Sequence, residues 1–270
     1  MKIFIGSISE HRIDVRMAKY MTTALESTYE IVDAEEADLL LIINGFLDDK
    51  YLVELSKTKP VLYFVDDHTL PILPGSVVVS QFFNDGDIRF LLSELMFFDV
   101  RFDKKVVADR IHKLAYWGHE KPERKAYYKK YLANKHSSLL IGEWDKDRAT
   151  VIPYTRDLDE MYDLLQAGTF TYVFGDEYHN GRNYPWRIHE ALMCGLVPYV
   201  DYDLVRGQRV GFPWQLIVKS PNHKRVRYDE AYKLMVGDIK VKRQEVADKL
   251  VKVIEEVKDR ANEKVYNGRY

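Results

Sequence analysis

Blocks of apolar residues alternate with amphipathic segments through the first hundred residues of the chain. Strand-like runs cover residues 2–7, 28–34, 37–44, 61–67 and 76–80, and helical periodicity covers 12–25, 51–57 and 87–98. The run ADLLLIIN (37–44) is continuously apolar, as expected for a parallel strand that is buried on both faces. This alternation predicts an α/β domain with a parallel sheet between layers of helices.

The same alternation restarts after residue 112. Strands are predicted at 113–118, 137–142, 149–154, 171–176, 197–203 and 216–220, and helices at 123–134, at 157–167 and from Pro185 onward. A long charged helix over 238–264 carries apolar residues at helical spacing, namely Val246, Leu250, Val253, Ile254 and Val257. We therefore predict two doubly wound domains, 1–108 and 109–237, that face a cleft, and a C-terminal helical segment, 238–270. In such folds ligands bind at the carboxyl ends of the strands.

Composition and charge exclude several classes of protein. Apolar residues make up 46% of the 270 residues, which is too high for a disordered chain. No apolar run approaches the roughly 20 residues of a membrane span, and the opening MKIFIGSIS reads as a strand and not as a signal peptide. The single cysteine, Cys194, excludes an internal disulfide framework and fits a reducing cytoplasm. The formal net charge of −2 gives no overall signal for nucleic-acid binding, so contact with DNA requires a local basic patch.

The segment GDEYHNGRNYPWRIHEALMCGLVPYVD (175–201) places two charged side chains near the start of a helix. Pro185 suits the first turn, so Arg187 and Glu190 share a helix face close to the amino terminus. Free N–H groups and partial positive charge there favour a phosphate, and an arginine can hold a diphosphate through two N–H donors. Glu190 can accept hydrogen bonds from two vicinal hydroxyls, as in a ribose. The pair suits a nucleotide-sugar site; the alternative is an ion pair within a solvated helix face.

Two further segments carry candidate chemistry. In YFVDDHTLP (63–71), Asp66 directly ends a buried strand, where partial burial can raise its pKa toward that of a useful base. Asp67 beside it can cap the loop or bind a metal, and the alternative for the pair is a loop-capping turn. In YWGHEKPERKAYYKKYL (116–132), a basic cluster of Lys121, Arg124 and Lys125 lies where a second phosphate-facing loop is expected, unless it belongs to an ordinary exposed helix.

The densest basic loop is KSPNHKRVR (219–227). It contains Lys219, Lys224, Arg225 and Arg227. Contact with a DNA backbone and simple solvation explain this loop equally well.

Three of these segments together resemble the DNA β-glucosyltransferase family of T-even phages, which glucosylates hydroxymethylcytosine in phage DNA. The family pattern matches without a gap from Gly175 through Glu190. The resemblance implies that Arg187 contacts the nucleotide phosphates and Glu190 the ribose, and Asp176 also matches. YFVDDHTLP implies that Asp66 is the catalytic base. YWGHEKPERK resembles the family's phosphate-binding loop at Gly118, with Lys121 at the first basic position and Lys125 or Arg124 at the second. The family has arginines there, and a lysine cannot form the same bidentate contact.

The resemblance also implies a fold, a reaction and partners. The fold would be GT-B, with two Rossmann-like domains: an acceptor-side or DNA-side domain at 1–108, a UDP-sugar domain at 109–237, and a helix at 238–270 that packs back toward the first domain. The donor would be UDP-glucose or a UDP-pentose, with Mg²⁺ or Mn²⁺ as an assisting ion. The acceptor would be double-stranded DNA containing 5-hydroxymethylcytosine or another 5-hydroxymethylpyrimidine. Asp66 would be the base of an inverting transfer. The enzyme would be a monomer and would act in the cytoplasm of an infected bacterial host.

A base inside a duplex must leave the stack to reach such a cleft. The segment 80–89, with Phe82 and Phe83, is a candidate for the side chains that assist base flipping. Two other functions fit the same sequence. One is a GT-B enzyme acting on a small-molecule, lipid or glycan acceptor, which the near-neutral charge favours. The other is a non-catalytic module that binds a nucleotide sugar or DNA.

Overall fold

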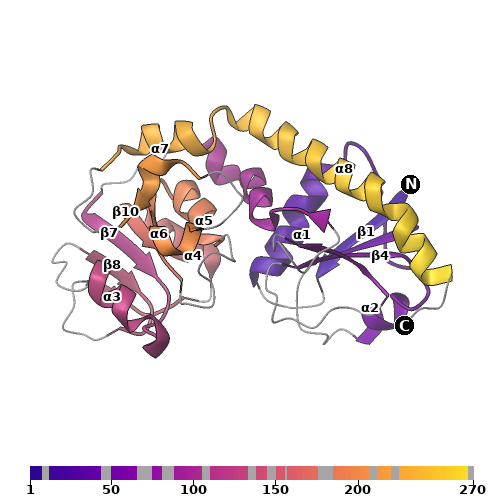
Figure 1. Ribbon diagram of the computed structural model, residues 1–270, viewed down its shortest axis with the longest axis horizontal. Coiled ribbons are helices and arrows are strands. Elements are labelled where there is room, and N and C mark those ends of the chain that lie inside the picture. The colour runs from indigo at the N-terminus through magenta and orange to yellow at the C-terminus, as the bar shows by residue number, and fades with distance from the viewer. Residues whose placement is uncertain are drawn as a thin grey trace. The chain divides into compact units, whose positions relative to one another are not determined.

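The computed structural model describes most of the chain, which falls into two compact units (Figure 1). The described residues are 1–7, 12–43, 50–65, 75–80, 88–104, 110–132, 138–144, 150–155, 157–175, 185–206, 212–219 and 225–266. One unit comprises Met1–Phe98 together with Lys240–Tyr270, and the other comprises Asp99–Ile239. The C-terminal segment therefore belongs to the same compact unit as the first residues of the chain.

The first unit is built on a parallel sheet. Among the described residues six strands form it, in the order β2-β1-β3-β4-β5-β6. Their bounds are β1 (Lys2–Ser7), β2 (Glu30–Ile31), β3 (Leu39–Ile43), β4 (Val61–Val65), β5 (Val77–Ser80) and β6 (Ile88–Arg89). Every residue of β3 and β4 is buried, as the continuous apolar runs predict. The unit also contains helices α1 (Arg12–Leu25) and α2 (Lys50–Leu55), the 3₁₀-helix η1 (Leu92–Phe98) and the C-terminal helix α8 (Ile239–Tyr266).

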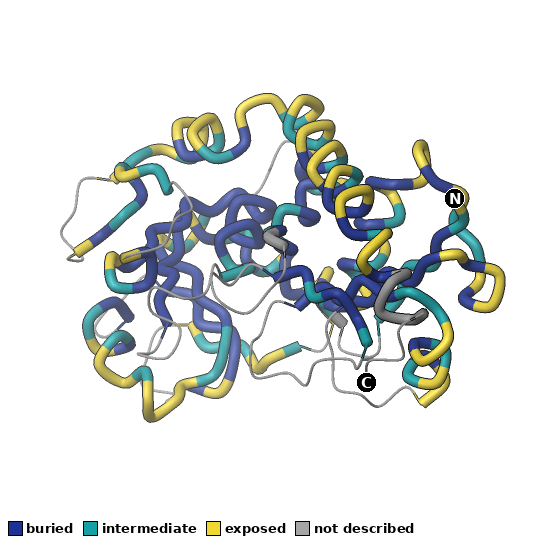
Figure 2. The backbone as a smooth tube through the Cα atoms, turned by 45° about the vertical axis from the view of Figure 1, so that its right-hand side comes forward, coloured by how far each residue is buried: buried dark blue, intermediate teal, exposed yellow. Residues whose placement is uncertain are grey.

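Helix α8 (Ile239–Tyr266) packs on the first unit through the apolar stripe read from the sequence. The stripe residues are all buried: Val246, Leu250, Val253, Ile254 and Val257. Polar contacts hold the same helix, since the Tyr29 hydroxyl donates to Glu255 Oε1 at 2.8 Å and Arg243 Nε donates to the Phe97 carbonyl at 2.6 Å. Figure 2 shows buried and exposed residues alternating along this helix.

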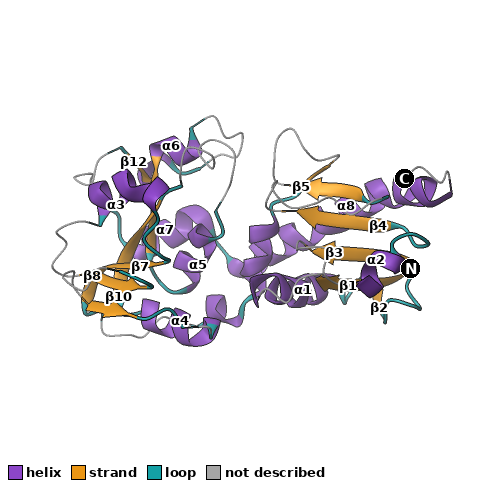
Figure 3. Ribbon diagram, turned by 90° about the horizontal axis from the view of Figure 1, so that it is seen from below, coloured by secondary structure: helices purple, strands orange, loops and turns teal. Residues whose placement is uncertain are grey.

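The second unit contains another parallel sheet flanked by helices (Figure 3). Its described strands follow the order β12-β11-β10-β7-β8-β9. They are β7 (His112–Trp117), β8 (Ser138–Ile141), β9 (Thr150–Ile152), β10 (Gly168–Val173), β11 (Val197–Asp201) and β12 (Ile217–Val218). The helices are α3 (Lys125–Tyr131), α4 (Leu158–Leu165), α5 (Arg187–Met193), α6 (Tyr202–Val205) and α7 (Tyr228–Met235), with 3₁₀ turns η2 (Val100–Asp103), η3 (Pro122–Arg124) and η4 (Trp214–Leu216).

Aromatic side chains fill much of the core of the second unit. The rings of Tyr116 and Phe174 stack with centroids 5.3 Å apart, and Tyr131 stacks on Tyr172 at 4.5 Å. Tyr128 and Trp144 meet edge to face at 4.8 Å. Offset and edge-to-face pairs of this kind add to the stabilisation from buried apolar area. Much of the high tyrosine content is therefore structural.

The α/β class with two doubly wound parallel sheets is confirmed, but some predicted elements differ. The helix expected over 87–98 is confirmed only in its second half, as the 3₁₀-helix η1, because Ile88 and Arg89 form β6 by pairing with Val79 and Ser80. A short apolar run does not by itself distinguish strand from helix, and here pairing to β5 decided the outcome. The strand expected at 28–34 contracts to β2, and helix α7 was not predicted. None of the helices in the described part of the chain is long and apolar enough to cross a membrane.

Candidate nucleotide site in the second unit

Strands β7 and β10 are parallel neighbours in the second sheet, and the order in which the chain adds strands reverses between them. From β7 the chain adds β8 and β9 on one side, and from β10 it adds β11 and β12 on the other. The two connections after β7 and β10 therefore diverge from the same carboxyl edge. A crevice at this point is where doubly wound sheets bind nucleotides.

A pocket of about 240 Å³ opens at this edge. Its lining comes from the turn after β7, the carboxyl end of β10, the start of α5 and helix α6: Arg124, Phe174, Gly175, Pro185, Trp186, Arg187, Glu190 and Leu204. Arg187 and Glu190, predicted to share a helix face, thus face one cavity. Arg187 is the first residue of α5 and Trp186 is its N-cap, so Pro185 lies just before the helix and not in its first turn.

Arg187 lies against aromatic rings that come from β7. Its guanidinium carbon is 4.8 Å from the centroid of Tyr116 and 5.1 Å from that of Trp117, within cation–π range. Nη1 also donates a hydrogen bond to the Tyr116 hydroxyl at 3.0 Å. Nε of Arg187 is buried and finds no hydrogen-bond partner among the described residues. The side chain is therefore oriented by the protein and retains donor capacity.

Two glycines let the turns after β7 and β8 approach each other. Gly118 has φ +124°, and a Cβ added there would lie 3.2 Å from Arg187 Nη2. Gly142, with φ +142°, faces the Gly118 carbonyl so closely that a Cβ would be 2.3 Å from its oxygen. Both backbone conformations and both contacts favour glycine. Gly118 thereby keeps the space in which the Arg187 guanidinium lies.

Glu190 is a buried carboxylate with a fixed orientation. The side chain is 7% exposed, and Oε1 accepts a hydrogen bond from the Tyr162 hydroxyl at 2.9 Å while Oε2 accepts one from Trp117 Nε1 at 3.3 Å. These donors come from α4 and β7. Burying a carboxylate is costly unless it is hydrogen-bonded, so the two donors account for an acidic side chain at this depth.

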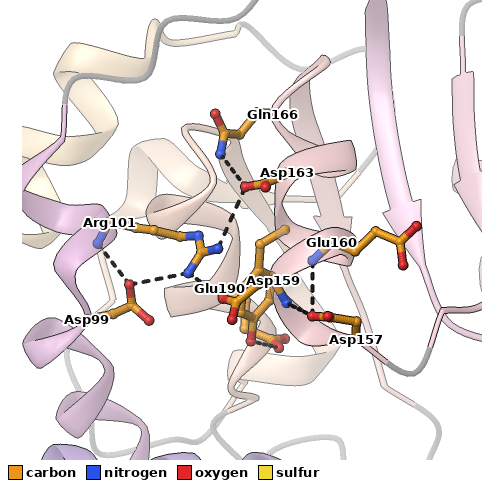
Figure 4. A network of polar contacts seen from close by, with 9 residues as sticks. Asp99, Arg101, Asp157, Asp159, Glu160, Asp163, Gln166 and Glu190 are labelled. Carbon is orange, nitrogen blue, oxygen red and sulfur yellow. Dashed lines mark hydrogen bonds and ion pairs between the residues drawn. The ribbon is translucent and has the colours of Figure 1, made fainter.

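A polar network on α4 lies next to Glu190 (Figure 4). Arg101 contacts Asp159 at 2.7 Å, Asp163 at 3.6 Å and Asp99 at 3.7 Å, and its guanidinium carbon is 5.3 Å above the Tyr162 ring. Burial lowers the pKa of Arg101, but the charges of the three carboxylates outweigh it and raise the pKa above its ordinary value. The guanidinium therefore stays charged while it packs against Tyr162.

The turn after β7 separates the three basic candidates of this segment. Arg124 is half-buried and lines the pocket, whereas Lys121 and Lys125 are exposed and are not among the lining residues. Burial raises the pKa of the nearby Tyr128, and the positive charges of Arg124 and Arg187 both oppose that rise. Both guanidinium groups therefore act on the same small region. Of the two residues between which the sequence left the second basic position open, Arg124 lines the pocket and Lys125 does not.

A buried carboxylate also supports the part of the pocket wall that helix α6 forms. Asp201 ends β11, is 1% exposed, and accepts hydrogen bonds from the Asp203 amide at 2.9 Å, from Lys130 Nζ at 2.9 Å and from the Tyr131 hydroxyl. The amide bond caps helix α6, which carries the lining residue Leu204. Asp201 is therefore a structural residue that positions one wall.

The described part of the basic loop 219–227 is engaged with its surroundings. Lys219 Nζ lies 4.5 Å above the Tyr202 ring, and the Arg225 guanidinium carbon lies 4.1 Å above the Phe170 ring. Arg227 pairs with Asp229, with Nε and Oδ1 3.0 Å apart. Lys219, Arg225 and Arg227 are nevertheless exposed, so their charges remain accessible from solvent.

Several predicted residues lie outside the described residues. They are Asp66, Asp67, Phe82, Phe83, Asp176 and Lys224. Within the described ranges no group of three or more His, Cys, Asp and Glu side chains is placed to hold a metal ion.

Three supporting residues were not assigned from the sequence. Tyr116 and Trp117 belong to the strand predicted at 113–118, and Tyr162 belongs to the helix predicted at 157–167. Their signal is the polar tip on a buried aromatic ring, which usually has a hydrogen-bond partner. The partner, however, is 28 to 73 residues away in the chain.

Comparison with known structures finds similarity over nearly the whole chain to two glucosyltransferases. T4 phage β-glucosyltransferase superposes with a TM-score of 0.62 and 13% identity, covering 98% of this chain and 99% of that one. The same enzyme with UDP and Mn²⁺ gives 0.62 and 11% over 98% and 99%. An α-glucosyltransferase with UDP and DNA containing a hydroxymethyluracil base (HMU) gives 0.55 and 12% over 100% and 95%.

Sequence comparison alone finds no counterpart. No protein-family model matches the chain, and no curated protein sequence matches it. At identities of 11% to 13% the structural likeness identifies the fold. The chain therefore has the two-domain GT-B fold, which it shares with the phage DNA glucosyltransferases.

Proposed function

We propose that this protein is a glycosyltransferase that transfers a sugar from a UDP-sugar to the hydroxymethyl group of a 5-hydroxymethylpyrimidine in DNA. The observation that carries the proposal is the pocket lined by Arg124, Arg187 and Glu190. It lies where the strand order of the second sheet reverses, between β7 and β10. Two guanidinium groups and a hydrogen-bonded carboxylate match the diphosphate and the ribose of a uridine diphosphate.

The donor assignment agrees with the chemistry of this pocket. Arginine presents a planar set of donors that suits phosphate oxygens, and Arg187 is already oriented by Tyr116. As the glycosidic bond of the donor breaks, negative charge grows on the departing UDP. Fixed positive groups stabilise that charge, because they need not reorganise when it forms.

The acceptor side of the mechanism rests on the sequence. Strand β4 ends at Val65, and Asp66 is the next residue in the sequence. In the proposed reaction Asp66 removes the proton from the hydroxymethyl group, whose oxygen attacks the anomeric carbon with inversion. The base would be flipped out of a duplex to reach the site. The basic residues Lys219, Lys224, Arg225 and Arg227 are candidates for contact with the DNA backbone.

The structural neighbours support DNA as the acceptor and a UDP-sugar as the donor. One neighbour was solved with its UDP-glucose substrate, one with UDP and Mn²⁺, and another with UDP and DNA containing a hydroxymethyluracil base (HMU). We therefore propose UDP-glucose or a UDP-pentose as donor, with Mg²⁺ or Mn²⁺ as a candidate ion.

Incubation with modified DNA tests this function directly. Duplexes that contain hydroxymethylcytosine or hydroxymethyluracil are incubated with a panel of UDP-sugars, and the nucleosides are analysed by mass. A hexose or pentose increment on the modified nucleoside, absent from unmodified DNA and from an Arg187→Ala and Glu190→Ala double variant, is the expected result. Transfer only to small glycosides or lipids would overturn the DNA acceptor, and UDP binding without any transfer would overturn the enzymatic function.

A further inference from the structure

Donors from two different elements reach the two carboxylate oxygens of Glu190. Tyr162 on α4 reaches Oε1 at 2.9 Å, and Trp117 at the end of β7 reaches Oε2 at 3.3 Å. Both donors are themselves buried, Tyr162 fully and Trp117 to all but 4%. A carboxylate bound in this way cannot rotate about its last bond without losing one of the two hydrogen bonds.

Tyr162 is in turn held in place. The Arg101 guanidinium lies above its ring, and the ion pairs of Arg101 with Asp159 and Asp163 tie that cation to the same helix (Figure 4). Asp157 caps the start of α4 by accepting from the Asp159 amide at 2.8 Å. The hydroxyl that contacts Glu190 therefore stands on a helix that is anchored at its first turn.

A carboxylate that accepts hydrogen bonds from the protein can also accept them from a ligand. Each carboxylate oxygen accepts more than one hydrogen bond, and Glu190 lines the pocket. Because the donors from the protein set the plane of the carboxylate, its orientation toward the pocket is determined before any ligand arrives. A fixed acceptor pair of this kind discriminates strongly against a ligand that lacks one hydroxyl, because the polar group is then left without its partner.

We propose that Tyr162 and Trp117 are positioning residues that orient Glu190 to bind two vicinal hydroxyls, so that the site selects ribonucleotide over 2′-deoxyribonucleotide donors. This inference rests on the proposed nucleotide-sugar site and adds a specificity to it. Tyr162 and Trp117 do not contact the sugar in this arrangement; they act through the carboxylate.

Calorimetric titration with three ligands tests the inference: UDP, 2′-deoxy-UDP and inorganic pyrophosphate. The quantity of interest is the ratio of the dissociation constants for 2′-deoxy-UDP and UDP. For the wild-type protein we expect this ratio to be about 10 or more, from the loss of one hydrogen bond to a charged group. Tyr162→Phe and Trp117→Phe should each lower the ratio toward 1, and Tyr162→Phe should leave pyrophosphate binding unchanged.

Two variants separate positioning from a general structural effect. Tyr199→Phe removes another buried tyrosine hydroxyl of the same unit, one that contacts Val226 instead of Glu190, and should leave the ratio unchanged. In a Glu190→Ala background, Tyr162→Phe should have no further effect on the ratio, because the group it orients is gone. Thermal unfolding of each variant shows whether the fold is retained.

The outcomes are distinct. An unchanged ratio in folded Tyr162→Phe and Trp117→Phe proteins overturns the positioning role and leaves the nucleotide site in place. The same conclusion follows if Tyr162→Phe lowers the ratio equally with and without Glu190. If the wild-type protein binds neither UDP nor pyrophosphate, the proposed nucleotide site itself is wrong and the inference is overturned with it.

Discussion

The guanidinium of Arg187 both packs on the ring of Tyr116 and donates a hydrogen bond to its hydroxyl at 3.0 Å. Tyr116 belongs to β7, and Arg187 belongs to α5, the helix that follows β10. The contact therefore lies where the strand order of the second sheet reverses. An arginine oriented by the protein loses less conformational freedom when it binds an anion than a mobile one does. The contact therefore orients a cation in the pocket, as the proposed phosphate contact requires.

Removal of the Tyr116 hydroxyl should weaken UDP binding. Tyr116→Phe keeps the ring under Arg187 but deletes the hydrogen bond that orients it, a loss of about 0.5–1.5 kcal/mol. The dissociation constant for UDP, measured by calorimetry, should rise roughly 2- to 10-fold. Tyr199→Phe is the matched control, and equal affinities for UDP in wild-type and Tyr116→Phe proteins would refute the role of this contact.

Neighbouring basic residues should differ sharply in their effect on phosphate binding. Arg124 lines the pocket and Lys125, the next residue, is exposed. Arg124→Ala should raise the dissociation constants for UDP and pyrophosphate about tenfold or more, because charge-assisted hydrogen bonds are lost. Lys125→Ala should leave both nearly unchanged. The reverse order of effects would assign the phosphate contact to Lys125.

A methyl group at Gly118 should disturb both stability and binding. Gly118→Ala imposes backbone strain of about 1–3 kcal/mol and places a Cβ beside Arg187 Nη2. Gly237 provides the comparison, since it has φ +68° and nothing within 4 Å of an added Cβ. Denaturant unfolding should show a loss of stability in both alanine variants, while UDP affinity should fall only in Gly118→Ala. An unaltered UDP affinity in Gly118→Ala would mean that the turn does not set the position of Arg187.

Asp66→Asn should separate catalysis from donor binding. An amide cannot accept the proton of the hydroxymethyl group, so transfer should fall by about 10²- to 10⁴-fold. The dissociation constant for UDP should not change, since the donor site proposed here lies in the second unit. Asp67→Asn is the adjacent control and should retain most of the activity. Retained turnover in Asp66→Asn would remove Asp66 from the mechanism.

Alkaline pH should unfold the second unit cooperatively. Burial raises the pKa of Tyr128, Tyr131 and Tyr228 above the ordinary value of about 10, with Asp201 adding to the rise at Tyr131. The folded state keeps protons that the unfolded chain releases, so their contribution to stability is complete below pH ~10 and is lost as the pH rises toward the folded-state pKa values.

Circular dichroism and tyrosinate absorbance, followed together against pH, check this prediction. Ionisation of the buried tyrosines should coincide with loss of secondary structure. Tyr131→Phe should reduce the steepness with which the unfolding free energy falls above pH ~10. Full ionisation of the tyrosines in a protein that keeps its circular dichroism spectrum would contradict the prediction.

Sequence patterns predicted most of the fold and part of the site. Continuous apolar runs identified β3 and β4, and helical spacing identified α1 with its observed bounds and the buried stripe of α8. The spacing of Arg187 and Glu190 placed both in one cavity. These features depend on residues that are close in sequence, where the period of the chain determines which side chains share a face.

Only the tertiary structure decided the rest. The pairing of β6 with β5 replaced the start of a predicted helix, and the tertiary fold brought Tyr116 to Arg187 and Tyr162 to Glu190. It also placed Arg124 in the pocket and Lys125 in solvent, although the two are adjacent in sequence. Such contacts join residues that are distant in the chain, so no local period encodes them. The sequence by itself determined which segments are buried and which residues carry charge; the packing of the sheet determined which of those charges meet.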